Sequence, residues 1–470
     1  MPMTTSKSIE RTAAMTCFFL IGACTGPGDS PGTVPAEAVD EAVHGKRPAP
    51  GPPPVNQVIC TTHSFPEVTW SVCLTKGPMK GVWIQSADIQ RKPGDPFIRV
   101  LSESGPADIF VPYHQSPGDR FYDMNQWAVL DPVYHPADVG PGGSVLTFPG
   151  DTQALLGKEV RDRGLAYLCK GTTSKVRRGQ ELVFWSVYDA GNYDYIVQYG
   201  FRDDGTITFR VGASGYNSGL HPFEAHMHNV LWRINADIAG GAMNDVFIDE
   251  HNEIPSPTPS LANDTSTQVL TEQFIDWNPL KFTTLRVTDV WTVNAVGDSI
   301  GYALEPLRPG TARHYNATAP SPFMEWFTQH DYAVTRNKPG ELGWTIPPHT
   351  PPDAYLLPQL GYTSSPPPGP PATPDLVAST DVILWYLSSA HHDPVDEDRP
   401  NYPANPSPAN GITLIHWAGV DFVPHNFFDY NPLGGPTRCD PLPVCGDSIC
   451  ESGEDCCNCP GDCGGGESCC

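Results

Sequence analysis

The most regular pattern along the chain is a pair of aromatic and β-branched runs, YIVQYGF at 195–201 and TITFRV at 206–211. Arg202-Asp203-Asp204-Gly205 separates them, and an Asp-Gly pair between two such runs predicts a β-hairpin. Nearer the N-terminus, four short runs bounded by glycine, proline or polar clusters predict further strands: VTWSVCLT, GVWIQSAD, FIRVLS and DIFVPY, between residues 58 and 113. Helical periodicity is scarce, so the pattern predicts an all-β domain.

Two histidines follow the hairpin with one residue between them. His226 and His228 would project from the same face of a strand, because side chains alternate along it. Neutral imidazole suits copper, zinc, iron and nickel, so a third histidine from elsewhere would complete a metal site. Alone, the pair is also compatible with a polar strand face, and Tyr193 alone with a tyrosine of the core.

The combination is more specific than its parts. Asn192-Tyr193-Asp194-Tyr195, followed by a hairpin and then His-x-His, resembles the signature of copper amine oxidases. The resemblance implies a large antiparallel β-sandwich, in which Tyr193, next to Asn192, is oxidised by copper and dioxygen to topaquinone. It also implies that His226 and His228 are the first two copper(II) ligands.

A second segment supports the same resemblance. The run DVILWYLSSAHH, followed by Asp-Pro-Val-Asp-Glu397-Asp398-Arg-Pro, resembles the family's strand that ends in its third histidine ligand. That register implies His392 as the third ligand. His391 competes with it, since adjacent strand residues point in opposite directions and only one can reach the metal.

Two residues nearer the N-terminus resemble the family's catalytic groups. Tyr113, in Val-Pro-Tyr, matches the tyrosine that hydrogen-bonds the quinone oxygen, and Asp123 matches the general base. The base must remove the α-proton of the bound amine in a pocket dry enough to raise its pKa. Met124-Asn125 replaces the family's Ser-Gly after this aspartate, which changes the local turn. By itself, an aspartate in such a loop is compatible with a turn cap.

Other matches are partial. Residues 233–237 (RINAD) resemble the family's Arg-Leu-Asp-x-Asp, which implies a peripheral cation, usually calcium, at Asn235, Asp237 and the distant Asp381. Cys169 matches the second cysteine of the family's internal disulfide, but Gly150-Asp151-Thr152 stands where the first is expected. Cys169 is therefore predicted to be unpaired or differently paired. Asp189 replaces the family's usual threonine before the quinone motif.

These matches favour oxidative deamination of a primary amine by dioxygen, giving an aldehyde, ammonia and hydrogen peroxide. The alternative is a catalytically inactive homologue that binds metal and serves binding or adhesion at the cell surface, motivated by the departures from the family pattern. A zinc hydrolase using the same three histidines is a third hypothesis, but it leaves Asn192-Tyr193-Asp194 unexplained.

Charge narrows the range of partners. The 470 residues carry 28 basic and 53 acidic side chains, a net charge of −25. Nucleic acid binding needs concentrated lysine and arginine, so the composition argues against a nucleic acid partner. An acidic surface would instead concentrate cationic amines near the site.

The resemblance also implies a homodimer.

The N-terminal residues predict export. Residues 1–23 carry Lys7 and Arg11 before a short apolar stretch, as a secretory signal does. Cys24 follows Gly-Ala, as in a bacterial lipobox, and its lipidation would anchor the chain to a membrane; an ordinary signal peptide is the alternative. Residues 24–57 are rich in proline and glycine and predict a tether.

The cysteines agree with an oxidising compartment. Cys60 and Cys73 are close enough in sequence to form one disulfide in an exported protein. Nine of the 14 cysteines lie in residues 439–470, which predict a small disulfide-rich tail able to hold calcium. The predicted organisation is therefore a signal, a tether, a catalytic domain over 58–438 and this tail.

Overall fold

The structure is a computed structural model. It describes residues 57–77, 81–113, 120–126, 129–131, 136–169, 175–215, 224–240, 243–251, 264–278, 281–307, 326–337, 374–395 and 416–433. The signal, the tether, Cys24, Glu397-Asp398 and the tail from 439 lie outside these ranges, as do the side chains around Cys169. What was predicted for these segments therefore stays a prediction. Within the same ranges no helix is long and apolar enough to cross a membrane.

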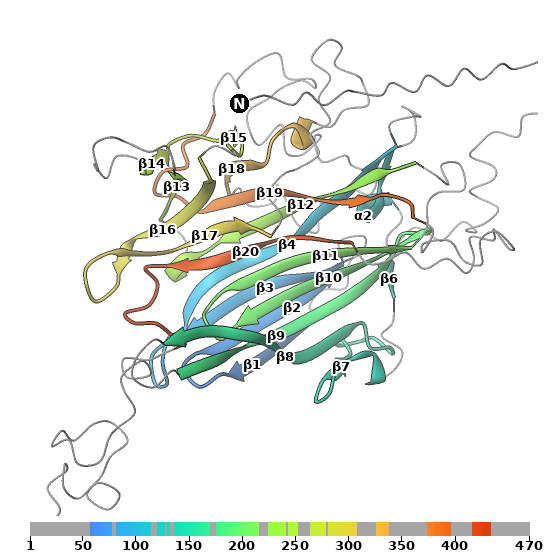
Figure 1. The fold of residues 1–470 in the computed structure, drawn as a ribbon, viewed down its shortest axis with the longest axis horizontal. Helices are drawn as coiled ribbons and strands as arrows, with labels where there is room; N and C mark the ends of the chain where they lie inside the picture. Colours follow the sequence, from blue (N-terminus) through green and yellow to red (C-terminus); the bar gives the residue numbers. More distant parts are fainter. Residues whose placement is uncertain are drawn as a thin grey trace, which may run out of the picture. The chain divides into compact units, whose positions relative to one another are not determined.

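The described residues form two large antiparallel sheets, which confirms the all-β prediction (Figure 1). Helices are confined to single turns: α2 (Asp123–Gln126), η1 (Pro136–Asp138), η2 (Ile238–Gly240) and η3 (Trp326–Gln329). The nine-stranded sheet has the order β1 (Val58–Ser64), β2 (Thr69–Gly77), β3 (Gly81–Gln90), β4 (Ile98–Pro112), β12 (His226–Ala236), β19 (Val382–His392), β18 (Tyr332–Arg336) and β15 (Gln273–Ile275), with β5 (Arg120–Tyr122) paired to β4.

The eleven-stranded sheet contains the predicted hairpin. Tyr193–Arg202 and Ile207–Gly215 pair as β10 and β11, which confirms the interpretation of the Asp-Gly turn. In spatial order this sheet contains β14 (Asp264–Val269), β13 (Asn244–His251), β16 (Thr283–Val293), β17 (Ser299–Pro306), β20 (His416–His425), β11, β10, β9 (Lys175–Asp189), β8 (Leu156–Cys169) and β7 (Ser144–Leu146), with β6 (Val129–Asp131) paired to β9.

One hydrophobic core joins the two sheets. Its members alternate along each strand: Val230, Trp232 and Ile234 on β12, and Tyr195, Val197 and Tyr199 on β10, are all fully or almost fully buried. Tyr199 donates a hydrogen bond from its hydroxyl across the interface to the carbonyl oxygen of Val82 (2.7 Å). Alternate positions on each strand therefore face the space between the sheets, and the intervening positions of the nine-stranded sheet face its other side.

One strand prediction is wrong in detail. The runs FIRVLS and DIFVPY belong to a single 15-residue strand, β4, although a polar Ser-Glu-Ser-Gly-Pro stretch separates their apolar residues. Two register shifts against β12 accommodate that stretch, so the strand bends instead of ending. Gly105 is needed there, because a Cβ at this position would lie 2.7 Å from the Trp83 ring.

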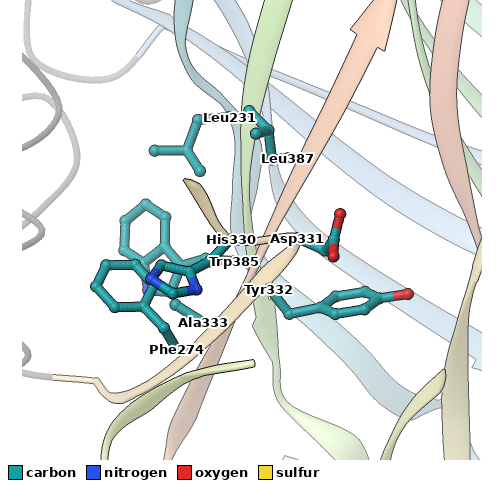
Figure 2. A pocket seen from close by; sticks show the side chains of 8 residues that line it. All are labelled: Leu231, Phe274, His330, Asp331, Tyr332, Ala333, Trp385 and Leu387. Atoms are coloured by element: carbon teal, nitrogen blue, oxygen red, sulfur yellow. The ribbon is translucent and has the colours of Figure 1, made fainter. Parts of the chain in front are cut away.

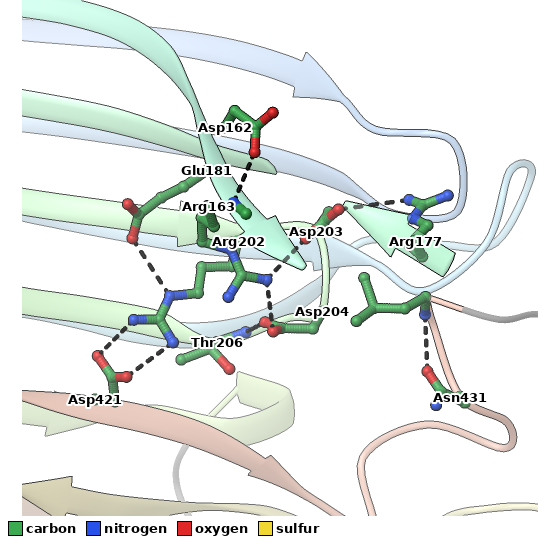
Figure 3. A network of polar contacts seen from close by, with 12 residues as sticks. Asp162, Arg163, Arg177, Glu181, Arg202, Asp203, Asp204, Thr206, Asp421 and Asn431 are labelled. Carbon is green, nitrogen blue, oxygen red and sulfur yellow. Dashed lines mark hydrogen bonds and ion pairs between the residues drawn. The ribbon is translucent and has the colours of Figure 1, made fainter. Parts of the chain in front are cut away.

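Ion pairs hold the β10–β11 turn end of the eleven-stranded sheet. Figure 3 shows Arg202 between Glu181 of β9 and Asp421 of β20, at 3.4 and 2.8 Å. The side chain of Asp203 is fully buried and accepts hydrogen bonds from Arg163 (3.0 Å) and Arg177 (3.4 Å). Because buried charges are stable only when paired, these contacts fix the turn against β8 and β9. At the edge of the other sheet, Cys60 and Cys73 form the predicted disulfide.

Candidate metal centre

Three histidines meet between the sheets. His226 is directly opposite His392 in the β12–β19 ladder, and His228 lies two residues further along β12 on the same face. All three are buried, and they offer nitrogen atoms within 4.8 Å of one another. His391 pairs with Met227 on the other face of the sheet and is exposed. The register therefore brings His392, and not His391, to the predicted cluster.

The donor set fits a metal ion. Nε2 of His228 is buried and has no hydrogen-bond partner among the described residues, although unpaired buried nitrogen is costly. Burial and the neighbouring imidazoles of His226 and His392 hold the pKa of His228 well below its ordinary value, which keeps the ring neutral. Nδ1 of His226 lies 3.0 Å from the carbonyl oxygen of Glu224, which fixes the orientation of its ring. Three neutral imidazoles of this kind suit copper or zinc.

The hydroxyl of Tyr193 lies inside the histidine cluster. It is 3.0 Å from Nε2 of His226 and 2.6 Å from Nδ1 of His392. The strand geometry brings it there: Tyr193 begins β10 on the buried face and is paired with Gly215. Gly215 has φ +148°, and a Cβ at this residue would lie 2.2 Å from the carbonyl oxygen of Asn192. A glycine is therefore required for the close backbone approach that positions Tyr193.

The predicted base, Asp123, is buried, and the side chain of Tyr195 lies between it and His228. Asp123 begins α2 and is 6% exposed. Burial raises its pKa to about 7, while the hydrogen bond that its Oδ2 accepts from the Tyr195 hydroxyl acts in the opposite direction. The Tyr195 hydroxyl is also 2.8 Å from Nδ1 of His228. Asp123 is thus a carboxyl group poised to change its protonation near neutral pH.

Tyr113 and Asn192 flank the cluster. Tyr113 follows β4, is 3% exposed, and its ring packs against the His226 ring with centroids 4.5 Å apart. Asn192 is half-buried in the bend directly before Tyr193. Tyr113 thus contacts one of the clustered histidines, and its hydrogen bond to a quinone oxygen stays a prediction.

The residues predicted for a peripheral cation lie at the far end of the β12–β19 ladder. Asp237 and Asp381 are the residues just beyond its last pair, Ala236 and Val382, and the charge of Asp237 helps burial to raise the pKa of Asp381. The Oδ1 atoms of Asn235 and Asp381 are buried and have no hydrogen-bond partner among the described residues. Calcium takes oxygen ligands of this kind, so the arrangement suits a cation. A peripheral calcium site stays a prediction.

Two departures from the family pattern have local explanations. Met124 is fully buried in the main core, so it fills space that a Ser-Gly pair would leave empty. Oδ1 of Asp189 accepts a hydrogen bond from the backbone nitrogen of Gly191 (2.7 Å), which closes the bend before Tyr193.

Two further residues of this site have no role predicted from the sequence. Tyr195 belongs to the Asn192–Tyr195 motif and to the hairpin, and no role in the site is predicted for it, although Tyr193 and Tyr195 are two apart and share a strand face. That spacing was a usable signal. His416 begins β20, and its ring lies 5.4 Å from that of His392. Nothing in the local sequence of His416 indicates this position.

A small cavity elsewhere is unrelated to the histidines. Figure 2 shows it against the other face of the nine-stranded sheet, with a volume of about 10 Å³, lined by Leu231, Phe274, His330, Asp331, Tyr332, Ala333, Trp385 and Leu387. On β12 and β19 these are the odd-numbered positions, whereas His226, His228 and His392 are even. Its volume suffices for about one water molecule, so it is not a substrate pocket.

Comparison with protein families matches residues 167–436 to the enzyme domain of copper amine oxidases. The match covers more than half of the chain and includes Tyr193 and all three histidines. The chain belongs to the copper amine oxidase family. Its buried three-histidine cluster is accordingly a copper-like site of the kind found in copper amine oxidases. Tyr113 and Asp123 precede the matched segment, so the roles expected for them stay predictions.

The relatives of this copper amine oxidase domain are distant. It is 23% identical over 313 residues to the peroxisomal copper-containing amine oxidase alpha 2 of Arabidopsis thaliana, covering 58% of this chain and 42% of that protein. It is 27% identical over 286 residues to the histamine oxidase of Arthrobacter globiformis, covering 55% and 38%. The matched segment thus spans less than half of each relative's length.

Solved structures agree on the fold. The copper-containing benzylamine oxidase from Hansenula polymorpha superposes with a TM-score of 0.60 at 16% identity, over 83% of this chain and 65% of that one. An amine oxidase from Aspergillus nidulans superposes with a TM-score of 0.54 at 19% identity, over 83% and 57%. At such identities the likeness concerns the fold alone.

Proposed function

We propose that this chain oxidises primary amines with dioxygen and water to an aldehyde, ammonia and hydrogen peroxide, using copper(II) and a topaquinone made from Tyr193. One observation carries the proposal: the Tyr193 hydroxyl lies within hydrogen-bond distance of two of the three clustered histidines. A buried tyrosine that only packs needs a partner for its hydroxyl, as Tyr199 has in the carbonyl oxygen of Val82, but it has no need of two imidazoles from a ligand cluster. The family supports amine and dioxygen as the substrates.

Each residue of the site has its own proposed role. His226, His228 and His392 would hold the copper ion, which with dioxygen supplies the oxidation of Tyr193 to an electrophilic quinone that accepts two electrons from the amine. Tyr113 packs on His226 and restricts the motion of that ring. Asn192 directly precedes Tyr193 in the chain and would restrict the position of the Tyr193 ring. Burial of the histidines and of the two tyrosines, Tyr113 and Tyr193, excludes water from the reacting atoms.

Asp123 is the proposed general base. Its Oδ2 accepts the hydrogen bond from Tyr195, and no hydrogen bond to Oδ1 is found among the described residues. Oδ1 can therefore take the proton from the carbon that bears the amino group. A pKa raised to about 7 by burial makes the carboxylate a stronger base than an exposed aspartate while it remains partly ionised at neutral pH.

The substrate class follows from the relatives and from charge. The names of two similar proteins refer to histamine and benzylamine, which are small primary amines. Amines of this kind are cations at neutral pH, and the net charge of −25 favours their approach. Export, attachment through Cys24, a peripheral calcium ion and a homodimer belong to the same proposal and are supported by sequence patterns and resemblance.

Copper reconstitution tests the proposed function. The chain produced without copper should bind copper(II) and then, in air, develop a visible quinone band that phenylhydrazine shifts. Added primary amine should then yield hydrogen peroxide. An anaerobic sample with the same copper content is the matched control, because it should bind the metal without developing the band.

Full copper occupancy without a quinone band would contradict the proposal. That outcome would favour the metal-binding homologue without catalytic activity. Zinc bound in preference to copper, with hydrolytic activity, would favour the third hypothesis. Each outcome is visible in the same preparation, from metal analysis and the absorption spectrum.

Salt dependence tests the role of surface charge. We expect KM for a cationic amine to rise at least about twofold between low and physiological ionic strength, because salt screens the attraction of the acidic surface. The value of kcat should stay constant, since the buried groups are screened much less. Steady-state kinetics in a sodium chloride series, with sucrose as the control for osmolarity, measures this. An unchanged KM would exclude steering by the net charge.

A further inference from the structure

We propose that Tyr195 is a positioning residue that couples the base Asp123 to the metal ligand His228. The roles of these two partners rest on the proposed function, while the contacts themselves are observed. Tyr195 would hold the carboxylate in place and, through the same hydroxyl, fix which nitrogen of His228 is available to copper.

The contacts are specific. Tyr195 is fully buried on the inner face of β10, two residues after Tyr193, and their rings are stacked with centroids 6.1 Å apart. Its hydroxyl donates a hydrogen bond to Oδ2 of Asp123 and lies 2.8 Å from Nδ1 of His228. Asp123 comes from α2 and His228 from β12, so this hydroxyl joins three separate elements.

The directions of these hydrogen bonds follow from the number of protons. A tyrosine hydroxyl has one proton, and an ionised carboxylate can only accept. When Asp123 is ionised, as a base must be, Tyr195 donates to it. The hydroxyl oxygen must then accept the proton that His228 carries on Nδ1.

This assignment has a consequence at the metal site. A neutral imidazole with its proton on Nδ1 has its lone pair on Nε2. Nε2 of His228 is buried and has no hydrogen-bond partner in the described part of the chain. His228 is one of the three clustered histidines. Asp123 thus acts on His228 through Tyr195, although no direct hydrogen bond joins them. Hydrogen bonds from such outer partners fix the tautomer and the orientation of a ligand and are commonly worth 10–100-fold in metal affinity, as an order of magnitude.

Tyr199 provides the matched control. It lies on the same face of the same strand, is almost fully buried, and donates its hydroxyl to the carbonyl oxygen of Val82 (2.7 Å), away from the histidines. Tyr195→Phe and Tyr199→Phe each remove one buried hydroxyl and one donated hydrogen bond. A merely structural role for Tyr195 predicts similar effects of the two changes on copper binding.

The experiment measures copper affinity without oxygen, so that Tyr193 stays unmodified. Chelator competition on the full chain should show copper binding about 10–100-fold weaker in Tyr195→Phe than in the wild type. Tyr199→Phe should bind copper as the wild type does. Equal copper affinity of Tyr195→Phe and the wild type would overturn the proposal.

A second pair of variants keeps the test decisive if Tyr195→Phe does not fold. Asp123→Asn and Asp123→Ala both remove the charge, but only the asparagine retains an oxygen that accepts from Tyr195. Without that acceptor the Tyr195 hydroxyl is free to donate to Nδ1 of His228, which moves the imidazole proton to Nε2. We expect Asp123→Ala to bind copper more weakly than Asp123→Asn, and this comparison does not need the Tyr195→Phe variant.

Equal copper affinities of Asp123→Ala and Asp123→Asn in the wild-type background would contradict the coupling. These measurements need no catalytic turnover. If the chain binds copper but forms no quinone, the proposed oxidase function fails while the coupling through Tyr195 can still be supported or rejected.

Discussion

Tyr193→Phe should abolish amine oxidation and leave copper binding intact. The variant lacks the phenol oxygen that lies 3.0 Å from His226 and 2.6 Å from His392, so no quinone can form from this residue. The three histidine nitrogens remain, because phenylalanine preserves the packing of the ring. We expect turnover to fall by at least about 10⁴-fold, since the cofactor supplies the whole oxidation. Peroxide release and the visible spectrum after copper addition measure the two effects.

Tyr199→Phe is the control for this prediction too. It removes a buried tyrosine hydroxyl from the same strand but leaves Tyr193 and the histidines unchanged. It should form the quinone and retain turnover. Amine oxidation by Tyr193→Phe at a rate near that of the wild type would show that Tyr193 is not the cofactor precursor, whatever the copper content.

Asp123→Asn should form the quinone but react slowly with amines. Asparagine has nearly the same shape and cannot take the α-proton, so kcat/KM should fall by about 10²–10⁴-fold, the usual contribution of a general base. Burial raises the pKa of Asp123 to about 7, and the positive charge of bound copper would lower it. In the wild type, kcat/KM should therefore decrease as the pH falls through a value at or below about 7, because a protonated carboxyl group cannot accept the proton.

The same measurements separate a base from a structural carboxylate. In Asp123→Asn the acidic limb of the kcat/KM profile should disappear along with most of the activity. An unchanged α-deuterium isotope effect combined with wild-type kcat/KM would place the base elsewhere. Loss of copper from this variant would instead indicate that Asp123 acts mainly by holding the site together.

Local pattern was enough to predict the β10–β11 hairpin and two of the three clustered histidines. Alternation of side chains on a strand put His226 and His228 on one face, and the Asp-Gly turn fixed the pairing of β10 with β11. Cys60 and Cys73 faced each other across β1 and β2 as their spacing suggested. In each case the interacting residues lie within about two dozen positions of each other, so the chain itself limits their separation.

The resemblance carried the longer-range predictions only part of the way. It implied His392 over His391, and the β12–β19 register is what places His392 opposite His226. It also pointed to Asp123, but the rise in the pKa of this residue depends on burial that no local pattern encodes. The polar stretch inside β4 looked like a strand end, and pairing with β12 on one side and β3 on the other made it a bulged strand.

Only the tertiary structure decided which side chains meet between the sheets. The Tyr195 hydroxyl contacts Asp123 and His228, which are 72 and 33 residues away in the sequence. His416 lies beside His392 because β20 packs against β19. Hydrophobic periodicity fixes the face on which a side chain lies, since it reflects the geometry of one strand. Which strands become neighbours depends on the packing of the whole core, and the site's electrostatics follow from that packing.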